Sequence, residues 1–416
     1  MEEKVSVLVV TNKEFNGDLL DSLEENKEYI KEIIFSGKET EIPHEFKELS
    51  VPVKFLNIES NNKAILRNKL AETASSEFLL FLNSGCSLED STIEELLEEM
   101  EETNADIVYP NLIIQFSGEE SIKNYHDLYG KEVDLVKSLS AEEFLPEWGI
   151  LVKKSSLIFL NYFNENFADY EFYEFIYRNL RKLKLRLSEF SYVNQTIYDS
   201  FIDTSYRSYV VRELILKNFD WKTEIFPFLS WDEKPEIAEA TALTIVGERL
   251  VHYYDYFNAT DYYRRALLTF HNQETLRQLV KTYIDMGLFD EARKLITDLQ
   301  GVSKKDQEEM TFYIDKISSL IEELEKAVEE GKLVEVITAI QEVTNFYSGA
   351  PIYNILGVIK WIQKEFDEAY KFFYKAVTMN PLSKDYLYNL IGMAKETGRE
   401  KEVKGLIERL VNSLNN

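Results

Sequence analysis

Three apolar runs in the first half of the chain each end in a polar residue that could help to hold a ligand. The run VSVLVV is followed by Thr11, EIIF by Ser36 and FLLFL by Asn83. Apolar, β-branched runs of this length are typical of strands that are buried on both faces of a sheet. Because ligands of open α/β sheets bind at the carboxyl ends of the strands, we expect the chemistry of the chain in these three loops.

The segments between these runs have the spacing of helices. Leu19, Leu20 and Leu23 recur at helical intervals after the first run, and residues 62–74 have a helical pattern before FLLFL. A succession of strand, helix and strand favours a mostly parallel sheet with helices on both faces. We therefore predict an α/β, Rossmann-like domain over residues 1–203.

The second half is predicted to be all helical and repetitive. Small or apolar residues align before the second helix of each unit at spacings of 33, 44, 33 and 34 residues. A period near 34 with paired helices is typical of a tetratricopeptide solenoid. We expect about five hairpins over residues 240–416, joined to the first domain by a connecting segment over 204–239. The aligned residues are Ala259, Ala292, Val336, Ala369 and Val403.

Charge and cysteine content limit the classes of function. The net charge of -27 opposes binding to nucleic acid or to anionic lipid. The single cysteine, Cys86, allows no intrachain disulfide, which suits a reducing compartment. The acidic start of the chain does not resemble a secretory signal, and no run approaches the ~20 apolar residues that span a bilayer. These features predict a cytoplasmic protein.

Longer segments of the first half resemble a family-2 glycosyltransferase domain of the GT-A fold, over about residues 4–200. VSVLVVTN resembles the opening strand and its loop, and NNKAILRNKLAETASSEFLLFLNSG resembles the central motif, with Arg67 and Asn68 as its Arg-Asn pair. FNENFADYEFYEFIYR resembles the later segment that carries an acidic pair. The resemblance implies transfer of a sugar from a nucleotide diphosphate donor to an acceptor.

The resemblance also implies which residues form the site. The catalytic base would be Asp169 or Glu171, although ADYEFYEF is equally typical of the start of a plain amphipathic helix. The residues implied for binding of the nucleotide sugar are Thr11, Asn12, Ser36, Lys63, Arg67, Asn83 and Gly85.

The sequence departs from the family where the family has aspartates. Phe35 and Ser36 occupy the position of the base-binding aspartates, Asn83 and Gly85 that of the metal-binding loop, and Phe172 that of the usual base. Mg²⁺ prefers carboxylate and phosphate oxygens, so we expect no metal ligands here, and Mg²⁺ or Mn²⁺ would bind only if other groups compensate. Without a metal, cations would have to stabilise the negative charge of the diphosphate, and Lys38, Lys63 and Arg67 are candidates for this role. The same residues could also be ordinary charged residues on the surface.

Two hypotheses follow from the sequence. In the first, the chain is a glycosyltransferase that uses a nucleotide-sugar donor and whose repeats hold a peptide or protein acceptor. In the second, it is a non-catalytic scaffold that binds protein partners, or a second copy of itself, through the repeats. The fold is shared by both hypotheses, so the residues of the site must decide between them.

Overall fold

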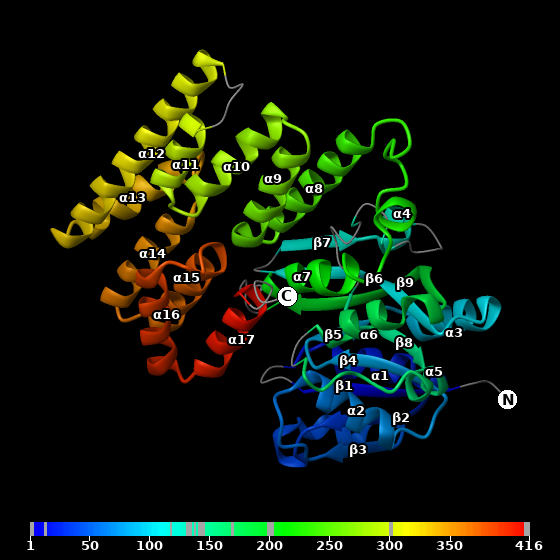
Figure 1. The fold of residues 1–416 in the computed structure, drawn as a ribbon. Helices are drawn as coiled ribbons and strands as arrows, with labels where there is room; N and C mark the ends of the chain where they lie inside the picture. Colours follow the sequence, from blue (N-terminus) through cyan, green and yellow to red (C-terminus); the bar gives the residue numbers. More distant parts are fainter. Residues whose placement is uncertain are drawn as a thin grey trace. The chain divides into compact units, whose positions relative to one another are not determined.

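The chain, in a computed structural model, divides into two compact units, unit 1 over residues 1–200 and unit 2 over residues 201–416 (Figure 1). The structure describes residues 4–11, 15–116, 119–129, 135–136, 139, 146–167, 170–197, 204–298 and 303–411. Two residues predicted for the site, Asn12 and Asp169, lie outside the described residues.

Unit 1 is built on one mixed sheet with the order β3-β2-β1-β4-β8-β6-β9-β5, and β7 pairs with the outer part of β6. The first four strands of this order run parallel, as predicted. From β8 onward antiparallel pairs predominate, so the expectation of a mostly parallel sheet was wrong for this half. The prediction rested on the βαβ succession of residues 5–82, and that succession ends with β4. The strands are β1 (Val5–Val10), β2 (Ile30–Ser36), β3 (Val53–Leu56), β4 (Phe78–Asn83), β5 (Cys86–Leu88), β6 (Ile107–Phe116), β7 (Glu119–Lys123), β8 (Ile150–Lys153) and β9 (Leu185–Ile197).

Helices cover the sheet and bury its central strands. Every residue of β1 and β4 is buried, as their continuous apolar sequences require. Helix α2 begins where the Asn62 side chain accepts a hydrogen bond of 3.2 Å from the backbone of Ile65, a normal N-cap. The helices of unit 1 are α1 (Leu19–Glu25), α2 (Lys63–Thr73), α3 (Thr92–Thr103), α4 (Tyr125–Tyr129), α5 (Lys154–Phe159) and α6 (Glu171–Asn179).

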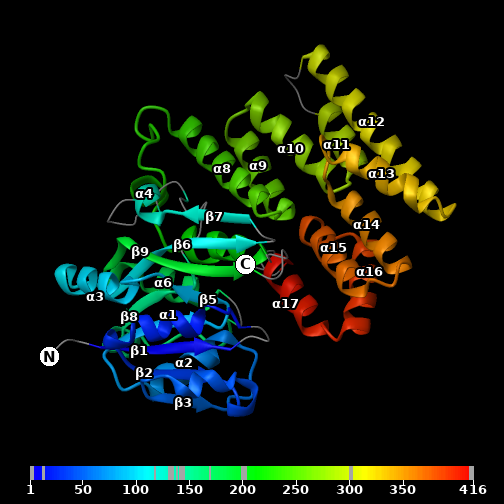
Figure 2. The same cartoon turned by 180° about the vertical axis from the view of Figure 1, so that it is seen from behind.

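Unit 2 consists of helical hairpins that follow an entry segment of short turns (Figure 2). In the entry segment, α7 (Ser205–Tyr209) continues into the π-helical turn η6 (Val210–Ile215), and a second turn, η7, covers Trp221–Ile225. The hairpin helices are α8 (Pro235–His252), α9 (Tyr256–Thr269), α10 (Gln273–Asp285), α11 (Phe289–Asp298), α12 (Lys304–Glu329), α13 (Leu333–Val343), α14 (Ala350–Ile362), α15 (Phe366–Met379), α16 (Lys384–Thr397) and α17 (Glu400–Val411).

The hairpin turns share one backbone feature. Each contains a residue with positive φ, and these residues follow one another at 33, 44, 33 and 34 positions, the spacing predicted from the sequence. Glycine accepts this conformation without steric cost, whereas other residues adopt it rarely. The backbone conformation of the turns therefore repeats along unit 2 at the predicted spacing. That these hairpins belong to the tetratricopeptide class stays a prediction. The residues are Tyr254 (61°), Gly287 (80°), Gly331 (77°), Lys364 (64°) and Gly398 (72°).

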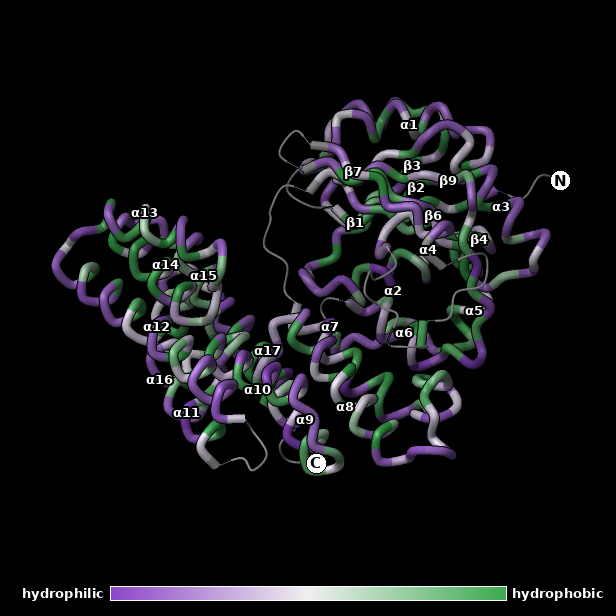
Figure 3. The backbone as a smooth tube through the Cα atoms, turned by 90° about the horizontal axis from the view of Figure 1, so that it is seen from above, coloured by the Kyte–Doolittle hydropathy of each residue, from purple (hydrophilic) through white to green (hydrophobic). Residues whose placement is uncertain are grey.

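Glycines inside two helices allow close helix packing. A Cβ atom on Gly357 of α14 would lie 2.5 Å from the Phe373 ring of α15, and one on Gly247 of α8 would lie 2.6 Å from the Tyr263 ring of α9. Both pairs occupy the same place in their hairpins. Hydrophobic and hydrophilic residues alternate along the helices of this unit, as packing on one face requires (Figure 3).

The aromatic residues of the entry segment pack within unit 2. Phe226 is fully buried, and its ring centroid lies 5.7 Å from that of Trp221. Trp221 in turn packs against the cluster of Ala240, Leu243 and Ala266. Phe228 is exposed, with its ring centroid 6.2 Å from that of Phe226.

Candidate functional site

The carboxyl ends of β1, β2 and β4 meet, as the sequence predicted. Val10 pairs with Ser36 on one side and with Asn83 on the other. At this edge Thr11 donates its backbone N–H to the Ser36 hydroxyl over 3.1 Å, and its own hydroxyl donates to the Ser36 backbone carbonyl. Two of the residues predicted to bind the nucleotide sugar are thus hydrogen-bonded to each other.

Asn83 also bonds within its own loop. Its side-chain oxygen accepts the Gly85 N–H over 2.7 Å and lies 3.4 Å from the Cys86 sulfur. The loop is fixed further by a bond of 2.7 Å from the Asn16 N–H to the Ser84 carbonyl. The amide oxygen that would have to replace a metal-binding carboxylate is therefore already an acceptor.

The described residues do not fit the family's metal. Within these ranges, no group of three or more His, Cys, Asp or Glu side chains is placed so that it could hold an ion. In the loop itself the side chains of Asn83 and Ser84 carry no charge. A divalent ion that binds a diphosphate prefers charged oxygen ligands, and among the described residues of the β4 loop Asn83, Ser84 and Gly85 supply none.

A cluster of phenylalanines surrounds the end of β2. Phe35 is fully buried, and its ring centroid lies 5.2 Å from that of Phe46 and 5.9 Å from that of Phe55. Phe15 joins the cluster at 5.5 Å from Phe46. The position where the family carries a base-binding aspartate is therefore part of the hydrophobic core in this chain.

Arg67 and Glu171 form an ion pair inside unit 1. Arg67 is in the middle of α2, and Glu171 is the first residue of α6, directly after Tyr170 with its positive φ of 58°. The Arg67 Nη1 and Glu171 Oε1 atoms are 2.6 Å apart, and both side chains are 0% exposed. The residue implied as a donor-binding cation and the one implied as the catalytic base therefore neutralise each other.

Aromatic rings enclose the guanidinium of this pair. The Arg67 Cζ atom lies 4.0 Å from the ring centroid of Trp148 and 4.4 Å from that of Phe172, while Nη2 donates to the Glu147 carbonyl over 2.8 Å. Guanidinium groups stack favourably on aromatic faces. Phe172, which stands where the family has its usual base, is thus part of the enclosure.

Burial dominates the electrostatics of Glu171. Desolvation raises the pKa of its carboxyl from 4.5 to about 7, although the Arg67 charge acts in the opposite direction. Glu147 raises this pKa further, and Lys63 lowers it. Among the described residues, neither carboxylate oxygen of Glu171 has a hydrogen-bond partner, and the same holds for the Arg67 Nη1 atom that it faces. Within the described part of the chain, the ion pair with Arg67 is consequently the one close polar contact that the structure gives this carboxyl, without the hydrogen bonds that usually stabilise a buried charge.

The other predicted cations have carboxylate neighbours. The Lys63 Nζ atom lies 3.9 Å from Glu147 Oε2, and the exposed Lys38 Nζ atom lies 3.7 Å from Glu41 Oε1. Sequence reasoning missed Glu147 and Trp148, because they are distant from Arg67 in the chain and stand in no recognisable motif. Only the fold brings them to α2.

Asn68, the partner of Arg67 in the predicted Arg-Asn pair, fixes the chain that leads towards α6. Its side-chain amide donates to the Phe163 carbonyl over 3.0 Å, and its oxygen accepts the Phe163 N–H over 3.1 Å. Phe163 in turn packs at 4.7 Å from Phe172. The Arg-Asn pair therefore connects α2 to the segment before α6 through Asn68, and to the first residue of α6 through Arg67.

Comparisons with known proteins agree with the class expected from the sequence. Residues 6–168 match the family model described as Glycosyl transferase family 2. The match supports the resemblance over this part of the chain. A search of curated proteins gives no match.

The solved structures that match this chain include two of S. aureus TarS 1-349. One is 15% identical, covers 79% of this chain and 92% of that chain, and has a TM-score of 0.42; the other, in complex with UDP-GlcNAc, has the same identity and coverage and a TM-score of 0.43. GalNAc-T7 with UDP, GalNAc and Mn²⁺ is 12% identical, covers 58% of this chain and 51% of that chain, and has a TM-score of 0.39.

No helix in the described part of the chain is both long enough and apolar enough to cross a membrane.

Proposed function

We propose that unit 1 is a glycosyltransferase-family domain that no longer transfers sugar, and that the chain acts as a protein-binding scaffold through its helical unit. The observation that carries this proposal is the Arg67–Glu171 ion pair, in which both side chains are fully buried. A catalytic base must come within hydrogen-bond reach of the acceptor. Glu171 instead faces Arg67, and the aromatic rings that enclose this arginine cover the pair.

The surroundings of the ion pair support the same conclusion. Asn83 supplies its amide oxygen to its own loop, and Phe35 fills the end of β2. A charge that develops on a departing diphosphate needs preorganised cations or helix N-termini. Arg67 is held by the buried Glu171, and the Lys63 Nζ atom lies 3.9 Å from Glu147 Oε2. Lys38 pairs only with the exposed Glu41 at 3.7 Å, a contact that is weak in water.

A second candidate is metal-independent sugar transfer to a peptide or protein acceptor. One observation favours it: a carboxyl with a pKa of about 7 and an oxygen without a hydrogen bond has the acidity of a general base. This candidate requires the Arg67–Glu171 pair to open when a donor binds, so that Arg67 meets the diphosphate and Glu171 the acceptor.

Calorimetric titration of the full chain with UDP and UDP-N-acetylglucosamine, with and without Mn²⁺, distinguishes these candidates. We expect no binding at ligand concentrations up to about 1 mM, which corresponds to a binding free energy weaker than about -4 kcal/mol. Binding that requires Mn²⁺ would overturn the proposal. Binding that is indifferent to Mn²⁺ and is weakened by Lys63→Ala would establish the second candidate instead. Lys69→Ala is the matched control, since Lys69 lies on the same helix as Lys63 and also pairs with a carboxylate, that of the exposed Glu72 at 2.8 Å.

A further inference from the structure

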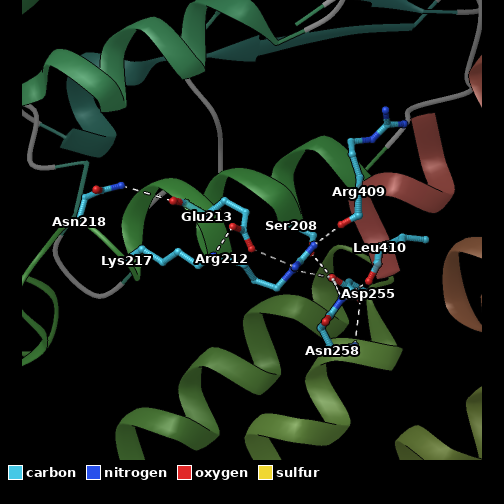
Figure 4. A network of polar contacts seen from close by, with 9 residues as sticks. All are labelled: Ser208, Arg212, Glu213, Lys217, Asn218, Asp255, Asn258, Arg409 and Leu410. Carbon is cyan, nitrogen blue, oxygen red and sulfur yellow. Dashed lines mark hydrogen bonds and ion pairs between the residues drawn. The ribbon is translucent and has the colours of Figure 1, made fainter. Parts of the chain in front are cut away.

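A buried polar network joins the two ends of unit 2. Its residues come from the entry segment (Ser208 and Arg212), from the turn and first residues that connect α8 to α9 (Asp255 and Asn258), and from the last turn of α17 (Figure 4). These segments are up to about two hundred residues apart in the sequence, yet all of them belong to unit 2.

Asp255 is the centre of this network. Its side chain is 0% exposed, and it accepts hydrogen bonds from the Asn258 backbone over 3.1 Å and from the Asn258 amide over 2.8 Å. Arg212 Nε donates to Asp255 Oδ2 over 3.1 Å, and the Ser208 hydroxyl donates to the same oxygen. A buried carboxylate is stable only with such donors, and here both oxygens have them.

The donors around Asp255 also hold the end of α17. Arg212 Nη2 donates to the Arg409 carbonyl over 2.6 Å, and the Asn258 amide donates to the Leu410 carbonyl over 3.1 Å. The last carbonyls of a helix have no partner within the helix, and a cation at this end is favourable. Side chains from the start of unit 2 therefore cap its last helix.

The side chain of Arg409 makes a second connection. Its Nε atom donates to the Ser205 hydroxyl over 2.9 Å, its Nη2 atom donates to the Tyr374 hydroxyl over 3.1 Å, and its Cζ atom lies 3.7 Å from the Tyr206 ring centroid. On the opposite side, α17 packs through Val403, Leu406 and Leu410 into the core shared with α15 and α16. The helix is thus joined to its neighbours by apolar contacts and to the start of the unit by polar ones.

Further contacts connect early and late hairpins. Tyr256 at the start of α9 and Met286 after α10 share a core cluster with Ala350 of α14 and Met379 of α15. The Lys375 Nζ atom lies 4.3 Å from the ring centroids of both Tyr254 and Tyr353. In a linear array of repeats each hairpin touches only the next one, and unit 2 does not follow this rule.

We propose that Ser208, Arg212, Asp255, Asn258 and Arg409 form a clasp that closes unit 2 on itself, with α17 as the strap that the clasp holds. An open solenoid frays from its ends, because each repeat depends only on its neighbours. A clasped unit opens cooperatively instead: α17 cannot leave without breaking the polar network at the start of the unit.

Native-state hydrogen exchange of the full chain, read by mass spectrometry, tests the clasp. In the wild-type chain we expect the amides of α17, η6 and the first turn of α9 to exchange through one common opening. Asp255→Asn removes the charge with little change of shape and leaves the buried Arg212 with Glu213 alone, whose Oε1 atom lies 3.5 Å from Arg212 Nη1. We expect it to accelerate exchange in all three segments together by about 100-fold, since breaking a buried charge pair is strongly destabilising.

Arg399→Gln is the matched control, because Arg399 precedes α17 and pairs with the exposed Asp367 at 3.2 Å. Exchange in the three segments should change by no more than about fivefold in this variant, as for other surface ion pairs. Should Asp255→Asn fail to fold, Arg409→Ala tests the same connection from a partly exposed position.

The clasp is refuted if α17 exchanges by fraying in the wild-type chain, independently of η6. It is also refuted if the clasp variants accelerate exchange in α17 and leave η6 and α9 as they were. Faster exchange in all three segments together supports the clasp. The Arg399→Gln control shows whether removal of any charge near α17 accelerates exchange in the same way.

Discussion

Replacing Glu171 with glutamine tests whether burial or the Arg67 charge dominates in the core of unit 1. Burial raises the pKa of Glu171 to about 7, against 4.5 for an ordinary glutamate. Between these two pH values the folded chain binds more protons than the unfolded chain. The free energy of unfolding must therefore fall as the pH rises through this window. Glutamine has the shape of the protonated carboxyl and no titration, so Glu171→Gln removes this dependence.

The size of the effect follows from the two pKa values. Their separation corresponds to about 3 kcal/mol, which is the stability that the wild-type chain loses relative to the variant between pH 4.5 and pH 8. We expect the two proteins to be about equally stable at pH 4.5. At pH 8 the variant should be the more stable one, although it lacks an ion pair of 2.6 Å. Arg67 is buried in both proteins, so the comparison isolates the free energy of ionising Glu171, which its raised pKa shows to be unfavourable in the folded chain.

The assay needs a probe of unit 1 alone, because a chain of two units need not unfold in one step. Cys86 is the single cysteine of the chain and is buried in unit 1. A short pulse of thiol reagent after equilibration in urea, normalised at each pH to the fully unfolded chain, therefore measures unfolding of this unit. If the difference between wild type and Glu171→Gln is independent of pH, or if the variant is less stable at pH 8, the account of Glu171 given above is wrong.

Three more outcomes are expected. Glu32→Gln should have the opposite pH dependence in the same assay, because hydrogen bonds from Lys54 and Ser75 outweigh burial and lower the pKa of the Glu32 carboxyl to about 2. The wild-type chain therefore gains stability from Glu32 above pH 4.5 and loses it towards pH 2. The variant lacks this stability, so it should unfold in acid at a higher pH than the wild-type chain. Gly357→Ala should lower the stability measured by thermal unfolding by about 1–3 kcal/mol, because the added Cβ atom would meet the Phe373 ring of α15. Gly392→Ala in α16, whose Cβ atom would have no neighbour within 4 Å, should raise the stability by about 0.5–1 kcal/mol, and equal effects of the two variants would contradict the packing described. Burial raises the pKa of the Cys86 thiol to about 12, so the native chain at pH 8 should react with thiol reagents only as fast as unit 1 opens, and rapid labelling without urea would show that the strand end is accessible.

The sequence predicted the regular parts of both units because their signals are local and periodic. Continuous apolar runs located β1 and β4, and the spacing of Ala259 and its equivalents matched the turns at Tyr254 and the later positive-φ residues. The antiparallel half of the sheet was not predicted, since strand direction depends on long connections whose sequence contains no periodic signal.

The candidate site was predicted in its location and missed in its contacts. The carboxyl ends of β1, β2 and β4 do meet, as the order of strands required. Nothing in the sequence indicated that Arg67 would face Glu171, or that Trp148 would cover the pair, because these contacts join segments about eighty to a hundred residues apart. A motif reports which residue types are present, whereas their exposure is decided by the packing of the whole unit.

The one irregular step of the hairpin repeat has a consequence for how this helical unit can change in length. The step from Gly287 to Gly331 is 44 residues, eleven more than the 33 of its neighbours, and it contains α12, which at 26 residues is twice as long as α10. Eleven residues make about three turns of an α-helix, so an insertion of this length leaves the later side chains at almost the same rotation. The lengthened part of α12 still meets the preceding hairpin, through Asp306 with Arg277 and Asp315 with Arg293. Related chains that lost or gained residues here would be expected to do so in whole turns, because any other number would rotate the apolar face of α12 into solvent.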